Sequence, residues 1–426
     1  MDDAPDGRLP RLALVFGGSA DDHSPLRFAE AAEGVCSLVW VIPPGGGRED
    51  RATLRFLGRL GDVVDTAELS AFSAADAIGA AAPDGIACFV DKHLAWTAEV
   101  AELLGLAFHS RFTADRLTDK LAQRTALREH GLPTPAFWDV DDLDERRLRD
   151  VADGGFPLVL KPRRGTSSKD TERIDDERRL RDAVAGSEPG RMLLEAYIPD
   201  PTTLQTGRGS APYASVELLV RRGVVGVLGI TGRTPLAPPF RETGFLFPAD
   251  VSRELAAALT GVAAAAMRAL GVEDGALHVE IKCTDDGPVV IEVNGRPGGH
   301  AVHPLLRRAL GIDTIRLAMR VAVGEDVEIG HLGDPDEVVF RLDVQPDAGL
   351  RSITAVEGLE AALSIPGVEQ VVQGLGPGDE VSWRTGTLGY VAAVLGSAPD
   401  HAAVSRIRDE VLGRIVVSGI DGEEVP

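Results

Sequence analysis

Residues 276–300 read ALHVEIKCTDDGPVVIEVNGRPGGH, and this stretch decides the fold. Its first half alternates polar and apolar side chains, with His278, Glu280 and Lys282 on one side, which is the two-residue period of a half-buried strand. Residues 285–288, Asp-Asp-Gly-Pro, have the composition of a turn. The residues after the turn again favour a strand. The stretch therefore predicts a β-hairpin.

The polar side of this hairpin indicates a metal site. If the hairpin is symmetric about Asp286, Glu280 lies opposite Glu292. His278 then lies opposite Asn294. Directly opposed residues are roughly 5 Å apart at Cβ, and two carboxylates at that distance repel unless a cation lies between them. Glu280, Glu292 and Asn294 offer only oxygen ligands, which favours Mg²⁺ or Mn²⁺ over zinc. The alternative is a solvated hairpin with ordinary surface charges.

Composition and charge restrict the class of protein. The 426 residues are enough for two to four domains with substantial cores. A net charge of −22 argues against a general nucleic-acid surface or an anionic membrane as partner, so we expect neither. Cys36, Cys88 and Cys283 are too few and too scattered for a disulfide framework, which favours a reducing, cytoplasmic location. No run approaches the roughly 20 apolar residues of a membrane span, and residues 1–11 are too acidic for a signal peptide.

The first hundred residues predict an α/β region. Apolar strands are expected at 12–16, 37–42 and 86–90, with alanine-rich helical stretches between them, which indicates a small parallel sheet with helices on its faces. Glycine-rich loops follow the first two strands, at 17–19 and 43–47. Either loop could hold a phosphate, but neither matches a dinucleotide fingerprint or a P-loop. We assign both to turns and expect no cofactor here.

The region after residue 112 carries phosphate-binding chemistry. Residues 113–130 predict one helix that carries Lys120 and closes at a glycine. A buried strand then ends at Lys161, and the loop after it contains Ser167 and Ser168. A cation followed by a loop of small, donor-rich residues is what a triphosphate needs. The alternative is a lysine that is only solvated.

Further motifs occur in a fixed order along the chain. They are Asp119-Lys120, Lys161-Pro162, Thr166-Ser167-Ser168, Glu195 with Ile198, Ser215-Val216-Glu217, Thr234-Pro235 with Glu242-Thr243, His278-Val279-Glu280-Ile281-Lys282, and Glu292-Val293-Asn294-Gly295-Arg296. Each motif alone is common. The ordered set resembles the ATP-grasp carboxylate–amine ligases, in particular the L-amino acid ligase (dipeptide synthetase) family.

This resemblance implies an ATP-grasp fold that combines α/β and α+β architecture. Residues 1–114 would form an N-terminal parallel α/β domain, and residues 115–334 the ATP-grasp domain, with a lid at about 135–195. Residues 335–426 would form a small C-terminal α+β domain. We expect that domain either to close one side of the site or to serve in packing or dimerisation.

The resemblance also implies roles for individual residues. Contacts to ATP are implied for Lys120, Lys161, Ser167, Ser168 and Lys282, an adenine hinge for Glu195, Tyr197 and Ile198, a ribose contact for Glu217, metal ligation for Glu280, Glu292 and Asn294, stabilisation of the acyl phosphate for Arg296, and the substrate side for His278 and Arg233.

Two positions depart from the pattern of relatives. The loop typically reads Ser-Ser-x-Gly-Val, whereas here it reads Ser167-Ser168-Lys169-Asp170-Thr171. Dipeptide ligases often have a histidine two residues before the cation of the central strand. In this chain that position, two residues before Arg233, is a threonine.

The expected activity is the ATP-dependent joining of an L-amino acid to an amine or a second amino acid, through an acyl phosphate. ATP and Mg²⁺ or Mn²⁺ would be the cofactors, with ADP and phosphate as products. One alternative is an ATP-grasp ligase or carboxylase that acts on another acid. A second is a nucleotide-binding regulatory protein without turnover, which the altered loop permits. The expected partners are small-molecule carboxylates and amines, and a homodimer is left open.

Overall fold

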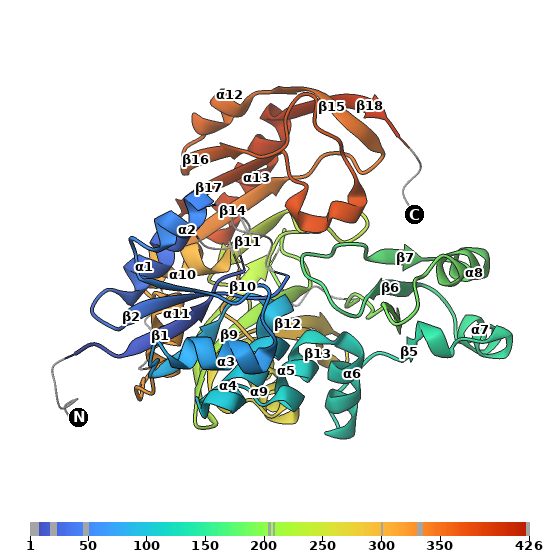
Figure 1. The fold of residues 1–426 in the computed structure, drawn as a ribbon. Coiled ribbons are helices and arrows are strands. Elements are labelled where there is room, and N and C mark those ends of the chain that lie inside the picture. Colours follow the sequence, from blue (N-terminus) through green and yellow to red (C-terminus); the bar gives the residue numbers. More distant parts are fainter. Residues whose placement is uncertain are drawn as a thin grey trace.

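The computed structural model describes residues 8–17, 24–45, 51–202, 206–207, 209–299, 301–329 and 335–422 (Figure 1). Within these residues the strands form four sheets. Parts of both glycine-rich loops (18–19 and 46–47) and the predicted boundary at residue 334 lie outside the described residues. The division into three domains stays a prediction.

The N-terminal region contains the predicted parallel sheet, in the order β3-β2-β1-β4. Its elements are β1 (Arg11–Val15), α1 (Pro25–Ala32), β2 (Ser37–Ile42), α2 (Arg51–Leu57), β3 (Asp62–Asp65), α3 (Ala71–Gly79), β4 (Gly85–Cys88), η1 (Asp91–His93) and α4 (Leu94–Leu104). The sequence reading missed β3, because the four residues Asp-Val-Val-Asp carry too short an apolar run to signal a strand.

The single helix predicted at 113–130 is wrong. The structure has two helices, α5 (Arg111–Thr118) and α6 (Lys120–Glu129), separated by Asp119 in an extended conformation. The Asp119 carboxylate accepts hydrogen bonds from the backbone N–H groups of Leu121 and Ala122, so it caps α6. It also accepts from Arg163 Nη2 at 2.7 Å. Asp119 therefore both ends α5 and starts α6.

A second sheet, which we call the lid sheet, projects from the rest of the molecule in Figure 1. It is antiparallel, with strand order β5-β8-β6-β7. Its elements are β5 (Phe137–Asp139), η2 (Val140–Asp142), α7 (Glu145–Asp153), β6 (Leu158–Pro162), β7 (Glu172–Ile174), α8 (Glu177–Ala185) and β8 (Met192–Ala196). Leu160, Leu180 and Leu194 are buried in its own small core.

The largest sheet has eight antiparallel strands, in the order β13-β12-β9-β10-β11-β14-β17-β16. They are β9 (Tyr213–Arg221), β10 (Val224–Arg233), β11 (Gly244–Phe247), β12 (Gly275–Thr284), β13 (Gly287–Asn294), β14 (Val338–Val344), β16 (Val368–Gln373) and β17 (Ala392–Ala398). Because β11 pairs directly with β14, the sheet runs without interruption from the hairpin into the C-terminal region. The sequence did not predict this continuity.

Helices cover the large sheet. They are α9 (Arg253–Leu270), α10 (Val302–Leu310), α11 (Thr314–Ala322), α12 (Leu359–Leu363) and α13 (His401–Arg414). Leu259 and Ala263 of α9 lie in one buried cluster with Val279 and Ile281 of the hairpin. The apolar side of the hairpin is therefore buried against α9, and its polar side is left for the site.

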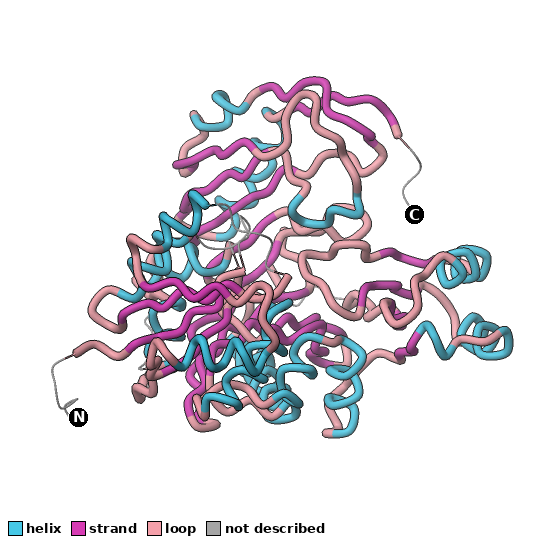
Figure 2. The backbone as a smooth tube through the Cα atoms, viewed as in Figure 1, coloured by secondary structure: helices cyan, strands magenta, loops and turns pink. Residues whose placement is uncertain are grey.

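The C-terminal region also holds a two-stranded sheet and a short 3-10 segment, visible at the top of Figure 2. The sheet pairs β15 (Leu350–Glu357) with β18 (Val416–Asp421), and the segment is η3 (Trp383–Leu388). Among the described residues, no helix combines the length and apolar character that crossing a membrane requires.

The hairpin has the predicted cross-strand pairs, but a β-bulge that the sequence did not show is what produces them. Glu280 pairs with Glu292, and His278 with Asn294, as expected. Symmetry about Asp286 implies a turn of three residues, 285–287. The turn has only two, Asp285 and Asp286, since Thr284 pairs with Gly287. A β-bulge at Ile291 adds the missing residue and restores the register. Without that bulge, Glu292 would point to the opposite face.

The double role of Asp119 generates a stability prediction. Asp119→Ala removes a helix cap together with charge-assisted hydrogen bonds from Arg163, so it should destabilise the protein by at least about 2 kcal/mol. Asp144→Ala is the matched control, because Asp144 caps α7 through the N–H groups of Arg146 and Arg147. It should cost about 1 kcal/mol. Equal shifts of the two urea midpoints would contradict the second role of Asp119.

Candidate active site

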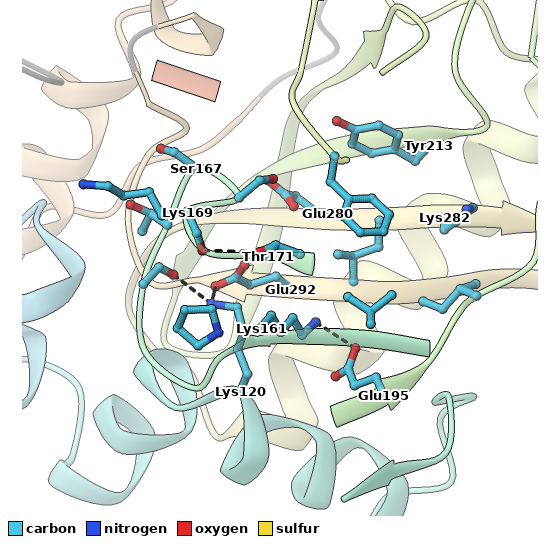
Figure 3. Close-up of a pocket in the computed structure, with 18 of the residues that line it drawn as sticks. Lys120, Lys161, Ser167, Lys169, Thr171, Glu195, Tyr213, Glu280, Lys282 and Glu292 are labelled. Carbon is cyan, nitrogen blue, oxygen red and sulfur yellow. Dashed lines mark hydrogen bonds and ion pairs between the residues drawn. The ribbon is translucent and has the colours of Figure 1, made fainter. Parts of the chain in front are cut away.

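The polar face of the large sheet gathers most of the predicted site residues. Glu280 is flanked by Glu292 on β13 and by Ser215 on β9, so the three side chains share one face of the sheet. His278 and Lys282 lie two residues to either side of Glu280 on the same face. Figure 3 shows Glu280 and Glu292 side by side, with Lys120 and Lys161 beside them.

Two cavities open onto this face. The first, which we call the lid cavity, has a volume of about 180 Å³ and lies between the lid sheet and the hairpin. Its predicted lining residues are Lys120, Lys161, Ser167, Ser168, Glu195, Tyr197, Ile198, Glu280, Lys282 and Glu292. Apolar side chains, including Val159, Leu236 and Ile291, complete its walls, so the cavity suits a flat apolar ring with charged groups at one end.

The second, which we call the central cavity, has a volume of about 560 Å³. Its lining includes the predicted residues Ser167, Arg233, His278, Glu280, Glu292, Asn294 and Arg296, together with Asp91, Glu242, Thr387 and Leu388. Glu280, Glu292 and the loop residues Gly165, Ser167 and Lys169 line both cavities. The two cavities therefore meet at the glutamate pair.

Cations already neutralise the two glutamates. Lys120 Nζ lies 3.0 Å from Glu292 Oε1, and His278 Nε2 lies 3.3 Å from Glu280 Oε1. Burial raises the pKa of Glu280, but the hydrogen bond and charge of His278 lower it by more than burial raises it, so the pKa is about 2. Burial likewise lowers the pKa of His278, while Glu217 and Glu280 raise it to about 9. The Glu280 carboxylate is thus held ionised, the form that ligates a metal.

The donor set fits a hard divalent ion that is shared with a substrate. Among the described residues, no group of three or more His, Cys, Asp or Glu side chains is arranged to hold a metal ion. Glu280, Glu292 and Asn294 provide two carboxylates and one amide oxygen on adjacent strands. Mg²⁺ is usually held by one or two carboxylates plus substrate phosphates, rather than by a cage of protein ligands. The set is therefore sufficient only when phosphate oxygens complete it.

Glu195 lies in a buried ionic network that the sequence did not predict. Its Oε1 accepts from Arg124 Nε at 2.6 Å, and its Oε2 lies 2.7 Å from Lys161 Nζ. Arg124 also donates to the carbonyls of Val290 and Ile291, the bulge residue and the residue before it. Glu195 therefore holds Lys161 in place, and the segment after it lines the lid cavity through Tyr197 and Ile198. The sequence did hold one signal for the role of Arg124, because this residue is a cation on the apolar side of α6.

Glu217 lies apart from the lid cavity. It is 2% exposed, and its carboxylate accepts from His278 Nδ1 at 2.8 Å. It is not among the described residues that line the lid cavity. It lies on β9, one strand further from the lid than β12, and its observed partner is His278. The ribose contact stays a prediction.

Lys282 and Tyr197 form a small cluster at the other end of the lid cavity. Lys282 Nζ donates to Tyr197 Oη at 3.0 Å and lies 2.9 Å from Asp200 Oδ1. Tyr197 Oη in turn donates to Asp200 Oδ2. The cluster ties the segment after β8 to β12, and with Ile198 it closes this end of the cavity.

Two arginines line the central cavity, and each is held by a carboxylate. Arg296 Nε donates to Asp91 Oδ2 at 2.7 Å, so a residue of the N-terminal region orients it. Arg233 is 1% exposed, and its Nε donates to Glu242 Oε1 at 2.7 Å. No role for Asp91 was predicted from the sequence, because its partner lies 205 positions away.

Comparisons with known proteins show which family and which folds the chain resembles. The ATP-grasp domain family matches residues 209–304. Residues 209–304 therefore resemble an ATP-grasp domain. The fold agrees with that of an L-amino acid ligase from Bacillus licheniformis, with a TM-score of 0.73 and 24% identity over 97% of this chain and 100% of that one. N5-carboxyaminoimidazole ribonucleotide synthetase from Thermotoga maritima also shares the ATP-grasp fold, with a TM-score of 0.66 and 17% identity over 96% of this chain and 100% of that one.

Proteins similar in sequence to this chain include ligases. It is 28% identical over 297 residues to the uncharacterized protein y4rH of Sinorhizobium fredii, which covers 69% of this chain and 59% of the relative. It is 27% identical over 263 residues to alanine–anticapsin ligase of Bacillus subtilis, which covers 58% and 55%. It is also 27% identical over 231 residues to D-alanine–D-alanine ligase of Bordetella petrii, which covers 52% and 68%. The chain thus spans less than two thirds of the first two relatives.

The network at Glu195 generates a pH-dependent prediction. Burial raises the pKa of Glu195, but Arg124 and Lys161 lower it by more than burial raises it. The pKa is therefore about 2, compared with an ordinary 4.5. The ionised carboxylate therefore stabilises the fold above pH 4.5, and this contribution is lost as the pH falls toward 2. Glu195→Gln leaves two buried cations without a countercharge, which should cost about 3–5 kcal/mol at pH 7. Urea unfolding at pH 7 and pH 3 measures the effect, and the difference should shrink at pH 3.

Asp200→Asn is the control for this experiment. Asp200 also pairs with a lysine, but its side chain is 59% exposed. Such a pair contributes at most about 1 kcal/mol. Similar losses for both variants would argue against a buried network at Glu195.

Proposed function

We propose that this protein is an ATP-dependent carboxylate–amine ligase that joins an L-amino acid to an amine or to a second amino acid. The observation that supports the proposal is the meeting of two cavities at Glu280 and Glu292. Lys120 and Lys161 line the cavity on one side of the pair, and Arg233 and Arg296 line the cavity on the other side. A site for phosphoryl transfer between two bound molecules needs this arrangement.

The reaction follows from the chemistry of carboxylates. A free carboxylate is a poor electrophile, because attack by an amine would have to expel oxide. Transfer of the γ-phosphoryl group of ATP to a carboxylate oxygen gives ADP and an acyl phosphate, whose leaving group is phosphate. The amine then attacks the acyl carbon, loses a proton and expels phosphate. The products are an amide, ADP and phosphate.

The residues of the chain divide this work. Lys120 and Lys161 neutralise charge on the nucleotide phosphates, and donors of the loop 165–171 bind their oxygens. Glu280, Glu292 and Asn294 would hold Mg²⁺, which would offset the negative charge of the transferring group. Arg296, oriented by Asp91, donates to the acyl phosphate and to the oxyanion that forms when the amine attacks. Arg233 and His278 line the part of the central cavity that would hold the acid substrate.

The altered loop is compatible with turnover. Asp170, at the position where relatives have glycine, does not line the lid cavity or the central cavity among the described residues. Its carboxylate pairs with Arg384 Nη1 at 3.4 Å instead. The negative charge therefore faces away from the phosphates, which favours an active ligase over a regulatory protein without turnover.

Nucleotide products test the proposal directly. We expect amino-acid pairs to trigger release of ADP and phosphate in equal amounts, with an amide product of matching mass. Screening single amino acids, pairs and bicarbonate by phosphate release and mass spectrometry covers the competing acid substrates. AMP and pyrophosphate as the stoichiometric products would overturn the acyl-phosphate mechanism. Phosphate release that no amine stimulates would favour the other classes.

The metal role is tested by two conservative variants. Glu280→Gln and Glu292→Gln each remove one ligand charge and should lower kcat by roughly 10²–10³-fold or more, the scale of losing one group that stabilises developing charge. Both should also weaken binding of Mn²⁺ in the presence of a non-hydrolysable ATP analogue, measured by calorimetry. Glu254→Gln, on the exposed side of α9, is the control and should behave as the native protein. Near-normal turnover of either variant at saturating Mg²⁺ would exclude a metal at this pair.

A further inference from the structure

The loop 165–171 adopts a backbone that its own residues disfavour. Ser167, Ser168 and Asp170 have φ values of 60°, 55° and 49°, in the left-handed region. Residues with a Cβ rarely adopt this region, and three of them in one short loop is unusual. Such a conformation persists only where neighbouring structure imposes it.

Hydrogen bonds within the loop are too weak to impose it. Lys169 N–H donates to Thr166 O and Thr171 N–H donates to Ser168 O, both at 3.3 Å, beyond the usual length. The shorter bonds come from outside. Lys120 Nζ donates to Gly165 O at 2.7 Å, and Thr387 N–H of η3 donates to Ser167 O at 2.9 Å.

Segment η3 of the C-terminal region contacts the loop over several atoms. Besides the bond from Thr387, the N–H of Asp170 donates to the carbonyl of Arg384 at 3.1 Å. Gly386 lies so close that a Cβ on it would be 2.0 Å from Ser167 O and 2.8 Å from Lys169 N. Gly386 itself has a φ of 69°. Only a glycine allows this backbone-to-backbone approach.

Segment η3 is in turn fixed to the large sheet. Gln345, directly after β14, donates from Nε2 to the carbonyls of both Thr387 and Glu242 at 2.9 Å. Thr387 Oγ1 accepts from Glu242 N–H at 3.2 Å, and Thr387 is 1% exposed. The loop, η3 and the segment that carries Glu242 therefore form one hydrogen-bonded unit at the junction of the two cavities.

We propose that Gly386 and Thr387 are positioning residues, which hold the loop 165–171 closed at the junction of the lid cavity and the central cavity. This rests on the proposed ligase function, in which water must not reach the acyl phosphate. The contact also accounts for the altered loop sequence. Asp170 donates its N–H to the carbonyl of Arg384 and turns its half-exposed carboxylate toward the Arg384 guanidinium, so the position tolerates a side chain that would otherwise face the phosphates.

The backbone contacts hold the loop, and the Asp170–Arg384 ion pair contributes little. The two side chains are 50% and 57% exposed and their charges are 3.4 Å apart, so solvent screens the pair. Gly386, by contrast, has no room for a Cβ, and Ser167 O, which would meet it, is backbone that cannot rotate away. Substituting Gly386 therefore displaces the loop without removing a charge.

Gly386→Ala is the decisive variant. We expect kcat for amide formation to fall by roughly 10²-fold, the scale of a displacement of about 1 Å at a reacting centre. We also expect phosphate release to exceed amide formation, because water then hydrolyses the acyl phosphate. Hydrogen exchange at the amides of residues 165–171 should become faster with ADP bound. A merely structural role would lower activity without changing the ratio of phosphate to amide.

Gly378→Ala is the matched control. Gly378 has a φ of 96° in the same C-terminal region, and a Cβ there would meet nothing within 4 Å. It reproduces the backbone strain without touching the loop, so its phosphate-to-amide ratio and loop exchange should be native. Native values in Gly386→Ala as well would overturn the proposal.

Two further outcomes are separable. If the native protein forms no amide, the proposed function fails, and the exchange comparison still decides whether η3 holds the loop. If Gly386→Ala does not fold, Thr387→Val decides in its place. It removes the acceptor for Glu242 N–H while leaving the Thr387 N–H, so it should shift ratio and exchange in the same direction by a smaller factor. Native values in that variant would then overturn the proposal.

Discussion

The guanidinium of Arg124 is the interaction on which the site depends. It lies in the interior, 1% exposed, and binds two separate strands of the chain. Its Nε and Nη2 donate to the Glu195 carboxylate of β8, its Nη1 donates to the carbonyl of Val290 on β13, and its Nη2 also donates to the carbonyl of Ile291. The planar fork of arginine suits this task, since an ammonium could not reach both partners in fixed directions. Through it, α6, the lid sheet and the hairpin keep one geometry.

The same interaction explains the register of the hairpin formed by β12 and β13. β13 is the edge strand of the large sheet, so its outer N–H and C=O groups need partners. Gln123 satisfies both backbone groups of Val293, and Arg124 takes the two carbonyls at the bulge. The bulge brings Glu292 opposite Glu280. The carboxylate pair therefore depends on a helix that begins 160 positions before Glu280 in the chain.

The sequence predicted the elements of the site better than their connections. The alternation around Glu280 predicted the face of β12 correctly, because a strand with one buried side has only one stable assignment. The pairing with Glu292 was predicted through a turn of the wrong length, which the bulge compensates. The break at Asp119 and the burial of Glu217 could not be read locally, because Arg163 and His278, which determine them, are distant in sequence. Propensity alone favours a continuous helix at 113–130.

The altered loop shows why a departure from a family pattern is hard to interpret from sequence. An aspartate in a phosphate-binding loop reads as a loss of function when only its neighbours along the chain are considered. The structure supplies the missing contact from η3, more than two hundred residues later, with a glycine whose lack of a Cβ permits the approach. Because η3 lies between β16 and β17, which continue the large sheet through β11 and β14, the C-terminal region is built into the frame of the site. The large sheet therefore sets the position of η3 relative to the hairpin, and the backbone hydrogen bonds from η3 join it to the loop of the lid sheet.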